Sequence, residues 1–252
     1  MKKVQQFIFL LVFSVLIITG CKKTISYQND MPEYMPMYSG KTMTYRLDST
    51  SFTNYGTQVT VTSYAVQDIV DTIILDNLNR PSWRVFRYIA DTAMTQPWTN
   101  LETYLVTPTK QTTEVFENNL RYIKLSLPLT DGFSWLGNSY IDTNYPPPNS
   151  NDPDYTYLAN WNYTYSNIGT AYTVLAGSIP NTLIVNQQNN VSGDTTNRST
   201  ISTIDYSVEV YAKGIGLIYK KFLHQENQPP NGDHPQPYSK GYGIVLNLIS
   251  HN

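Results

Sequence analysis

Cysteine and charge are the two things this sequence has least of. Cys21 is the single cysteine among 252 residues, so no intramolecular disulfide can form. Charged residues make up only 14% of the chain, and no segment gathers lysine and arginine into the basic stripe that nucleic acids bind. The composition therefore excludes a disulfide-stapled fold and argues against a nucleic-acid partner. Stability has to come from burial of apolar surface, for which the chain is long enough.

Strand-forming residues dominate what is present. The chain has 21 tyrosines, and threonine, serine and asparagine are abundant, a composition that suits half-buried pleated surfaces better than helices. Apolar and polar residues alternate in segments such as 43–48, 58–66 and 208–213, with turn residues between them. The sequence predicts an all-β fold of roughly 10–12 antiparallel strands, a strongly curved sheet or an incomplete barrel or sandwich. No helix is expected after residue 20.

The N-terminus has the layout of an export signal. Lys2 and Lys3 precede an apolar run over residues 7–19, which is interrupted only by Ser14. A run of roughly 13 residues is shorter than the about 20 that a membrane-spanning helix needs, and matches the core of a signal peptide. We expect residues 1–20 to form a signal helix that is removed on export.

Ile18-Thr19-Gly20-Cys21 resembles a bacterial lipobox, placed directly after this signal core. The resemblance implies cleavage between Gly20 and Cys21 and acylation of Cys21, with chains such as palmitate. Each buried methylene contributes about 0.8 kcal/mol, so two or three acyl chains hold a protein on a membrane. The expected partner is therefore a membrane, reached through lipid on Cys21.

The rest of the chain divides simply. We expect a lipidated flexible tether over residues 21–34 and a single β-rich domain over residues 35–252. Removal of Lys2 and Lys3 leaves 15 basic residues against 19 acidic ones, a net charge of about −4 with neutral histidines. A proline-rich loop over residues 142–154 separates segments of similar character, so it does not mark a second domain.

Three short motifs resemble a family of uncharacterised lipoproteins common in Bacteroidota. They are Pro36 with Gly40, the segment Leu127-Pro128-Leu129 with Gly132 and Trp135, and the strand Tyr211-Ala212-Lys213-Gly214-Ile215-Gly216-Leu217. The resemblance implies a β-rich envelope domain with a strongly curved sheet, similar to the carrier-like half-barrels that hold lipid. It brings no catalytic residues and no cofactor. Surface-exported members carry acidic residues after the acylated cysteine, whereas Lys22 and Lys23 stand here, which favours an outer-membrane protein facing the periplasm.

Glycine and histidine patterns do not point to a cofactor or metal site. Gly214 and Gly216 lack the third glycine and the following helix of a dinucleotide-binding loop, so we interpret them as structural glycines at a bulge or tight bend. His224, His234 and His251 have no second ligand at metal-binding spacing and are expected on the surface. We therefore expect no metal site and no cofactor.

Two groups of residues leave alternatives open. Trp161, Tyr163 and Tyr165 fall on one side of a strand, where they either pack in the core or form an exposed face on which a sugar ring stacks. Four carboxylates, Glu102, Glu114, Glu117 and Asp131, could form a hydrolytic pair only if the fold brought them together.

These observations support three hypotheses of function. The first is a non-enzymatic, membrane-anchored envelope lipoprotein that binds an apolar or amphipathic ligand, or a protein partner, on the concave face of the sheet. The second is a carbohydrate-binding lipoprotein that uses the aromatic face. The third and weakest is a hydrolase with a scattered carboxylate site.

The lipobox hypothesis predicts the behaviour of a Cys21→Ser variant. The variant should leave the membrane fraction or accumulate as an uncleaved precursor, because serine has no thiol to acylate. Cell fractionation and metabolic labelling with a radioactive fatty acid measure both effects. Acyl labelling that persists in the variant would show that the lipobox interpretation is wrong.

Overall fold

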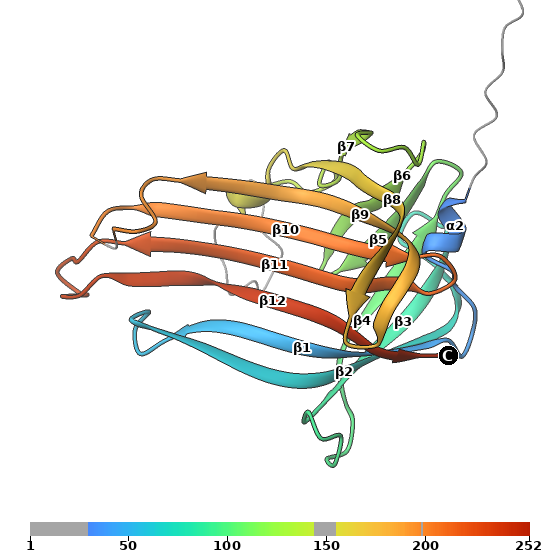
Figure 1. Cartoon of the computed structure of the whole chain (residues 1–252), viewed down its shortest axis with the longest axis horizontal. Coiled ribbons are helices and arrows are strands. Elements are labelled where there is room, and N and C mark those ends of the chain that lie inside the picture. Colours follow the sequence, from blue (N-terminus) through green and yellow to red (C-terminus); the bar gives the residue numbers. More distant parts are fainter. Residues whose placement is uncertain (1–29, 144–154, 198) are drawn as a thin grey trace, which may run out of the picture.

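The computed structural model describes residues 30–143, 155–197 and 199–252 (Figure 1). The expected signal peptide, the cleavage and lipidation site at Gly20 and Cys21, and residues 21–29 of the expected tether lie outside these ranges. The elements are α2 (Met31–Tyr34), β1 (Thr42–Thr53), β2 (Gln58–Leu75), β3 (Pro81–Ala90), β4 (Thr99–Pro108), β5 (Thr112–Glu117), β6 (Leu120–Ser126), β7 (Ser134–Leu136), the 3-10 turn η1 (Thr156–Leu158), β8 (Asn162–Val174), β9 (Gly177–Ser192), β10 (Ser202–Ala212), β11 (Gly216–Gln228) and β12 (Tyr238–His251).

All twelve strands in the described part of the chain belong to one antiparallel sheet. Its order is β6-β5-β4-β3-β2-β1-β12-β11-β10-β9-β8-β7. Strands β1 to β6 thus form one meander and β7 to β12 another, and the two join where the first strand pairs with the last. The sheet curls into a nearly closed barrel, so the predicted all-β fold class is confirmed.

The two edge strands of the sheet meet at a seam. The Ile123 amide donates a 2.8 Å hydrogen bond to the Gly137 carbonyl, and the Trp135 indole donates one of 2.8 Å to the Ile123 carbonyl. The Tyr165 hydroxyl donates to the Ser126 carbonyl at 2.9 Å and accepts from the Ser126 amide at 2.8 Å. A few bonds of this kind satisfy edge groups that would otherwise be open to pairing with another chain.

A second layer covers part of the outside of the sheet. The hairpin of β8 and β9 curls across β10, β11 and β12 (Figure 1). At its turn the Ala176 amide donates to the Leu248 carbonyl at 2.9 Å, and the Leu175 amide donates to Asn247 Oδ1 at 2.7 Å. A hydrophobic cluster that includes Val174, Ile179 and Leu248 is buried there.

Helix α2 belongs to the folded domain, which corrects the expected boundary of the tether. Met31 and Tyr34 are buried, and the Lys213 ammonium contacts Asp30 at 2.8 Å and Glu33 at 3.3 Å. The domain therefore begins no later than Asp30, rather than at residue 35. The helix and η1 also correct the expectation of no helix after residue 20. Neither of these two helices, the ones found in the described residues, has the length and apolar character to cross a bilayer.

Packing at the seam generates a prediction about stability. A Cβ atom at Gly137 would overlap three ring carbons of the buried Tyr163, so Gly137→Ala should lower the free energy of unfolding by about 1–3 kcal/mol. Gly232→Ala is the matched control, because a Cβ there meets open space. Chemical denaturation measures both variants, and equal stability of the two would contradict the packing described here.

Candidate ligand-binding cavity

A cavity of about 1040 Å³ lies inside the curved sheet. Strands of both meanders line it, together with η1 and the turn between β5 and β6. Small-molecule sites in proteins usually measure about 300–1,000 Å³. The cavity can therefore hold a ligand of substantial size, and it is open to solvent rather than sealed.

Two neighbouring strands, β11 and β12, supply alternate residues to the cavity. Successive side chains of a strand point to opposite faces, so every second residue faces inward. The inward residues are Lys220, Phe222, His224 and Glu226 on β11, and Lys240, Tyr242, Ile244 and Leu246 on β12. At about 3.3 Å per residue, the β11 column spans roughly 20 Å from Lys220 to Glu226.

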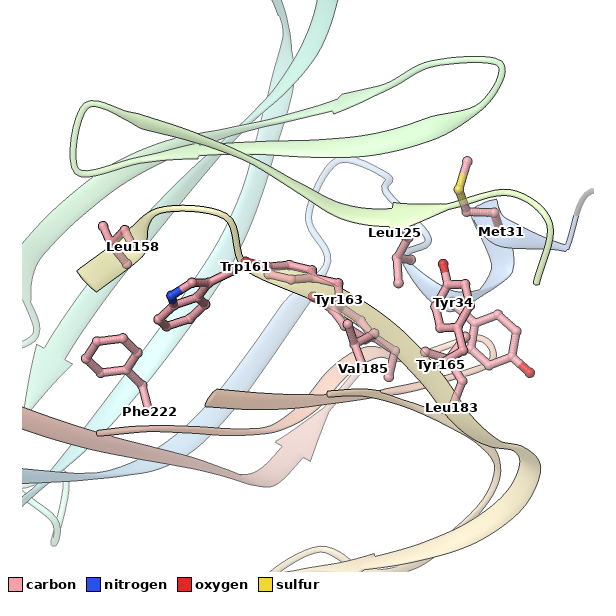
Figure 2. Close-up of a cluster of buried hydrophobic side chains, with 11 residues drawn as sticks. Met31, Tyr34, Leu125, Leu158, Trp161, Tyr163, Tyr165, Leu183, Val185 and Phe222 are labelled. Carbon is pink, nitrogen blue, oxygen red and sulfur yellow. The ribbon is translucent and has the colours of Figure 1, made fainter. Parts of the chain in front are cut away.

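Aromatic rings form one wall of the cavity. Trp161 and Phe222 face each other across a gap bordered by Leu158, as Figure 2 shows, with ring centroids 6.2 Å apart. Tyr242 lies 5.0 Å from Phe222, and Tyr157 of η1 stacks on the His224 ring at 3.8 Å. Rings in such stacked and tilted contacts present broad apolar surfaces to the cavity.

A layer of charged side chains forms the floor of the cavity. We call it the charged layer; its members are Asp68, Arg87, Glu102, Glu117, Lys124, Glu209 and Lys220. Arg87 on β3 lies opposite Asp68 on β2 and Glu102 on β4 in the strand register. Its guanidinium donates to both Asp68 oxygens at 2.7 and 2.8 Å and to Glu102 Oε1 at 2.7 Å.

The other half of the charged layer crosses the barrel. Lys124 on β6 donates a 2.8 Å hydrogen bond to Glu209 on β10, although these strands lie far apart in the sheet order. Lys220 on β11 lies 3.4 Å from Glu117 on β5, and Lys124 lies 3.5 Å from the same carboxylate. Glu209 also accepts from Gln187 at 2.8 Å and from the Tyr211 hydroxyl at 2.6 Å.

The pKa values in this layer follow from the partners of each group. Burial tends to raise the pKa of Glu117, but the charges of Lys220, Lys124 and Arg87 outweigh burial and lower it to about 2. The pKa of Glu209 is also lowered, because Lys124 and Lys220 overcome its burial. Glu102 differs: burial raises its pKa, with a contribution from Glu117, more than Arg87 lowers it.

The charged layer separates the cavity from the packed end of the barrel. A second void of only about 50 Å³ lies beyond it, and Arg87, Glu117, Lys124 and Lys220 border both spaces. That end is closed by the segment after α2, where the buried Lys41 ammonium donates to the carbonyls of Pro36 at 2.6 Å and Ile215 at 2.5 Å. Burial lowers the pKa of Lys41 to about 8.

Away from the floor, β10 and β11 hold a buried pair of His224 and Asp205. The two residues lie opposite each other in the register, and His224 Nδ1 is 2.7 Å from Asp205 Oδ1. An ionised carboxylate can only accept, so the bond requires a proton on Nδ1. The expectation that His224 lies on the surface is therefore wrong: its residue is 6% exposed and lines the cavity.

The three aromatic residues at the start of β8 and just before it do not form an exposed face. Trp161, Tyr163 and Tyr165 are 2%, 1% and 1% exposed, which corrects the hypothesis of a flat sugar-stacking surface. Tyr165 packs at the seam, whereas Trp161 and Tyr163 contribute to the cavity wall. Trp135 lies opposite Tyr163 on the paired strand β7, with the rings 5.7 Å apart, and the curl of the sheet brings Leu125 of β6 into the same buried cluster.

The other residues singled out from the sequence are dispersed. Gly214, in the turn after β10, and Gly216, the first residue of β11, have φ of +77° and +107°. Glu102 and Glu117 both line the cavity, but Glu114 binds Arg80 and Arg121 elsewhere. Asp131 accepts from the Ile168 amide at 3.1 Å. The described residues contain no group of three metal-ligating side chains.

Removing one charge from the pair of Lys124 and Glu209, which spans the barrel, should destabilise the fold. Lys124→Met leaves Glu209 buried without its cation and should lower the free energy of unfolding by about 3–5 kcal/mol. Arg46→Met is the control, since its pair with Asp48 is on the surface and such pairs contribute about 0–1 kcal/mol. Denaturant titration tests this; a loss in Lys124→Met as small as in the control would contradict it.

Acid should weaken the fold partly through Glu117. Its pKa is lower in the folded protein, about 2, than the usual value of 4.5 for a glutamate, so its contribution is complete above pH 4.5 and is lost as pH falls toward 2. Glu117→Gln should flatten the decline in unfolding free energy between these values by up to about 1.4 kcal/mol per pH unit. Denaturation at several pH values measures the slope, and an unchanged slope would refute the assignment.

Comparison with known proteins finds a structural similarity. No protein-family model and no curated protein matches the chain. Among solved structures, a "putative exported protein with YmcC-like fold" from Bacteroides fragilis is similar: it is 12% identical, the match covers 86% of this chain and 97% of that one, and the TM-score is 0.35. At this identity and score we derive neither ligand nor activity from it.

Proposed function

We propose that the chain is a lipid-anchored protein of the bacterial cell envelope that binds an amphipathic ligand in its cavity and carries out no reaction on it. The export signal and the lipobox-like sequence at Cys21 support the location, and Lys22 and Lys23 favour the periplasmic side of the outer membrane. The observation that carries the binding function is the cavity of about 1040 Å³ with an aromatic wall and a polar floor.

The walls match a ligand with an apolar part. Besides its aromatic rings, the cavity is lined by the aliphatic side chains of Leu47, Val66, Leu101, Leu120, Leu158, Ile244 and Leu246. Covering apolar ligand surface contributes roughly 25 cal/mol for each Å² removed from water. The floor and the His224 region offer charges and hydrogen-bonding atoms, so a ligand with one polar end fits better than a pure hydrocarbon.

The carboxylates of the cavity support binding rather than hydrolysis. Glu102 is bonded to Arg87, and Glu117 lies between two lysines at 3.4 and 3.5 Å. Both are therefore occupied by the ion pairs that hold the floor together. The ring of opposite charges gives them a structural role without any substrate.

The proposal predicts occupancy by a neutral hydrophobic dye, N-phenyl-1-naphthylamine. The full chain in lipid nanodiscs should bind the dye, and Ile244→Glu should weaken binding at least about tenfold, because it buries a carboxylate in the apolar wall. Ile249→Glu on the same strand is the control, since Ile249 is 36% exposed and does not line the cavity.

Dye fluorescence, corrected with empty nanodiscs, measures this binding. Native mass spectrometry of the full chain purified from its own membranes then identifies any small molecule that accompanies it. Equal affinity of the wild type and of Ile244→Glu for the dye would contradict the proposal.

A further inference from the structure

The cavity contains an imidazole nitrogen that is ready to accept a hydrogen bond and has no donor. The side chain of His224 is 7% exposed, and its Nδ1 is held by Asp205. When the imidazole carries one proton and Asp205 holds it on Nδ1, Nε2 is an acceptor. No residue of the described ranges donates to it, and the neighbouring Glu226 Oε1, which lies 3.9 Å away, is itself an acceptor.

The ring cannot easily turn to find another partner. Tyr157 stacks on its face at 3.8 Å with an angle of 13° between the planes. On the other side of the histidine, the register holds Asp205 directly opposite on β10. Two neighbours thus fix the orientation of Nε2, and neither of them uses its lone pair.

His224 Nε2 and Glu226 Oε1 together form a slot for a donor. Two acceptors do not bond to each other, but a single ammonium nitrogen between two acceptors 3.9 Å apart can donate to both at ordinary hydrogen-bond lengths, and a hydroxyl group can donate to one of them. A carboxylate or phosphate placed there would face two lone pairs and would be repelled.

The carboxylates nearest to His224 act in the same sense: Asp205 is bonded to its Nδ1, and Glu226 Oε1 lies 3.9 Å from its Nε2. Over the whole cavity, the charged lining residues are three acidic ones, Glu102, Glu117 and Glu226, and four basic ones, Arg87, Lys124, Lys220 and Lys240. Lys240 lies opposite Glu226 in the register, but its ammonium forms no ion pair within 4.0 Å in the described ranges and sits 5.7 Å from the Tyr238 ring.

We infer that His224 and Glu226 recognise a head group that donates hydrogen bonds, an ammonium or a hydroxyl group, on an amphipathic ligand whose apolar part lies along the aromatic wall. The inference rests on the proposed function and adds the polarity of the ligand to it. Phe222 is the inward-facing residue of β11 that precedes His224. It places the apolar part of the ligand next to the head-group site formed by His224 and Glu226. Asp205 is a positioning residue, because it acts by fixing the proton on His224.

The test compares three ligands with the same eight-carbon chain: octylamine, octyl glucoside and octanoate. Radiolabelled ligands are bound to the full chain in nanodiscs, and counts on empty nanodiscs are subtracted. We expect at least one of the two donor ligands to bind about tenfold or more tightly than octanoate. Octanoate binding as tightly as both donors would overturn the inference.

Two variants assign this selectivity to the slot. His224→Phe with Asp205→Leu keeps a ring for Tyr157 to stack on and removes both buried polar partners together, a change that is often nearly neutral for stability. The preference for donors over octanoate should fall to within about twofold. Arg84→Met with Asp71→Leu is the control; it removes an ion pair that does not line the cavity and should leave the preference unchanged.

Glu226→Gln separates the two kinds of donor. Loss of the charge should weaken octylamine about tenfold if the head group is an ammonium, and should leave octyl glucoside within twofold if it is a hydroxyl. A donor preference that survives in the His224→Phe and Asp205→Leu double variant refutes the inference. Binding of the neutral dye in that variant shows separately that the cavity, and with it the proposed function, is intact.

Discussion

The ion pair between Lys124 and Glu209 is the contact on which the rest of this barrel depends. The two edge strands of this sheet, β6 and β7, form no continuous ladder with each other. Without contacts across the interior, only the curvature of the sheet would keep these edges together. Lys124 comes from edge strand β6 and Glu209 from β10, so their 2.8 Å bond spans the interior rather than following the ladder. Lys220 and Glu117 form a second crossing beside it. These two interior ion pairs hold β5 and β6 toward the opposite half of the barrel, and thereby set the geometry of the backbone hydrogen bonds at the seam.

Burying a layer of charges costs desolvation free energy. The position of the charged layer explains why apolar residues in its place would not have the same effect. Well-packed apolar side chains often match or exceed a buried ion pair in stability, but they achieve it by filling space. Here filling would extend the packed end, with its void of about 50 Å³, into the cavity of about 1040 Å³. Charges that satisfy one another across the barrel hold the walls apart. They also leave a polar floor that water can wet, whereas purely apolar cavities stay dry.

The class of fold could be predicted from the sequence, but the cavity could not. Alternation of apolar and polar residues indicates strands and their number, because it reflects a local two-residue period. It does not say which face is the inside when both faces of a strand are covered. Trp161 and Tyr163 were correctly grouped on one side of the chain, yet they are buried in a cluster with Leu125 of β6, the strand at the opposite edge of the sheet. His224 had no visible partner because Asp205 stands 19 residues away and meets it only through the register of β10 and β11.

The place where the chain enters the domain bears on how a ligand would reach the cavity. Asp30 and α2 pack against the turn between β10 and β11, at the closed end of the barrel (Figure 1). The β11 column runs from Lys220 at the floor toward Glu226, away from that turn. With the proposed lipid anchor at Cys21, nine residues before Asp30, the closed end would lie nearer to the membrane than the open end. The head-group slot would then point away from the anchoring bilayer. Such an orientation suits exchange of a ligand with a partner or a second surface across the periplasm better than extraction from the membrane that carries the anchor.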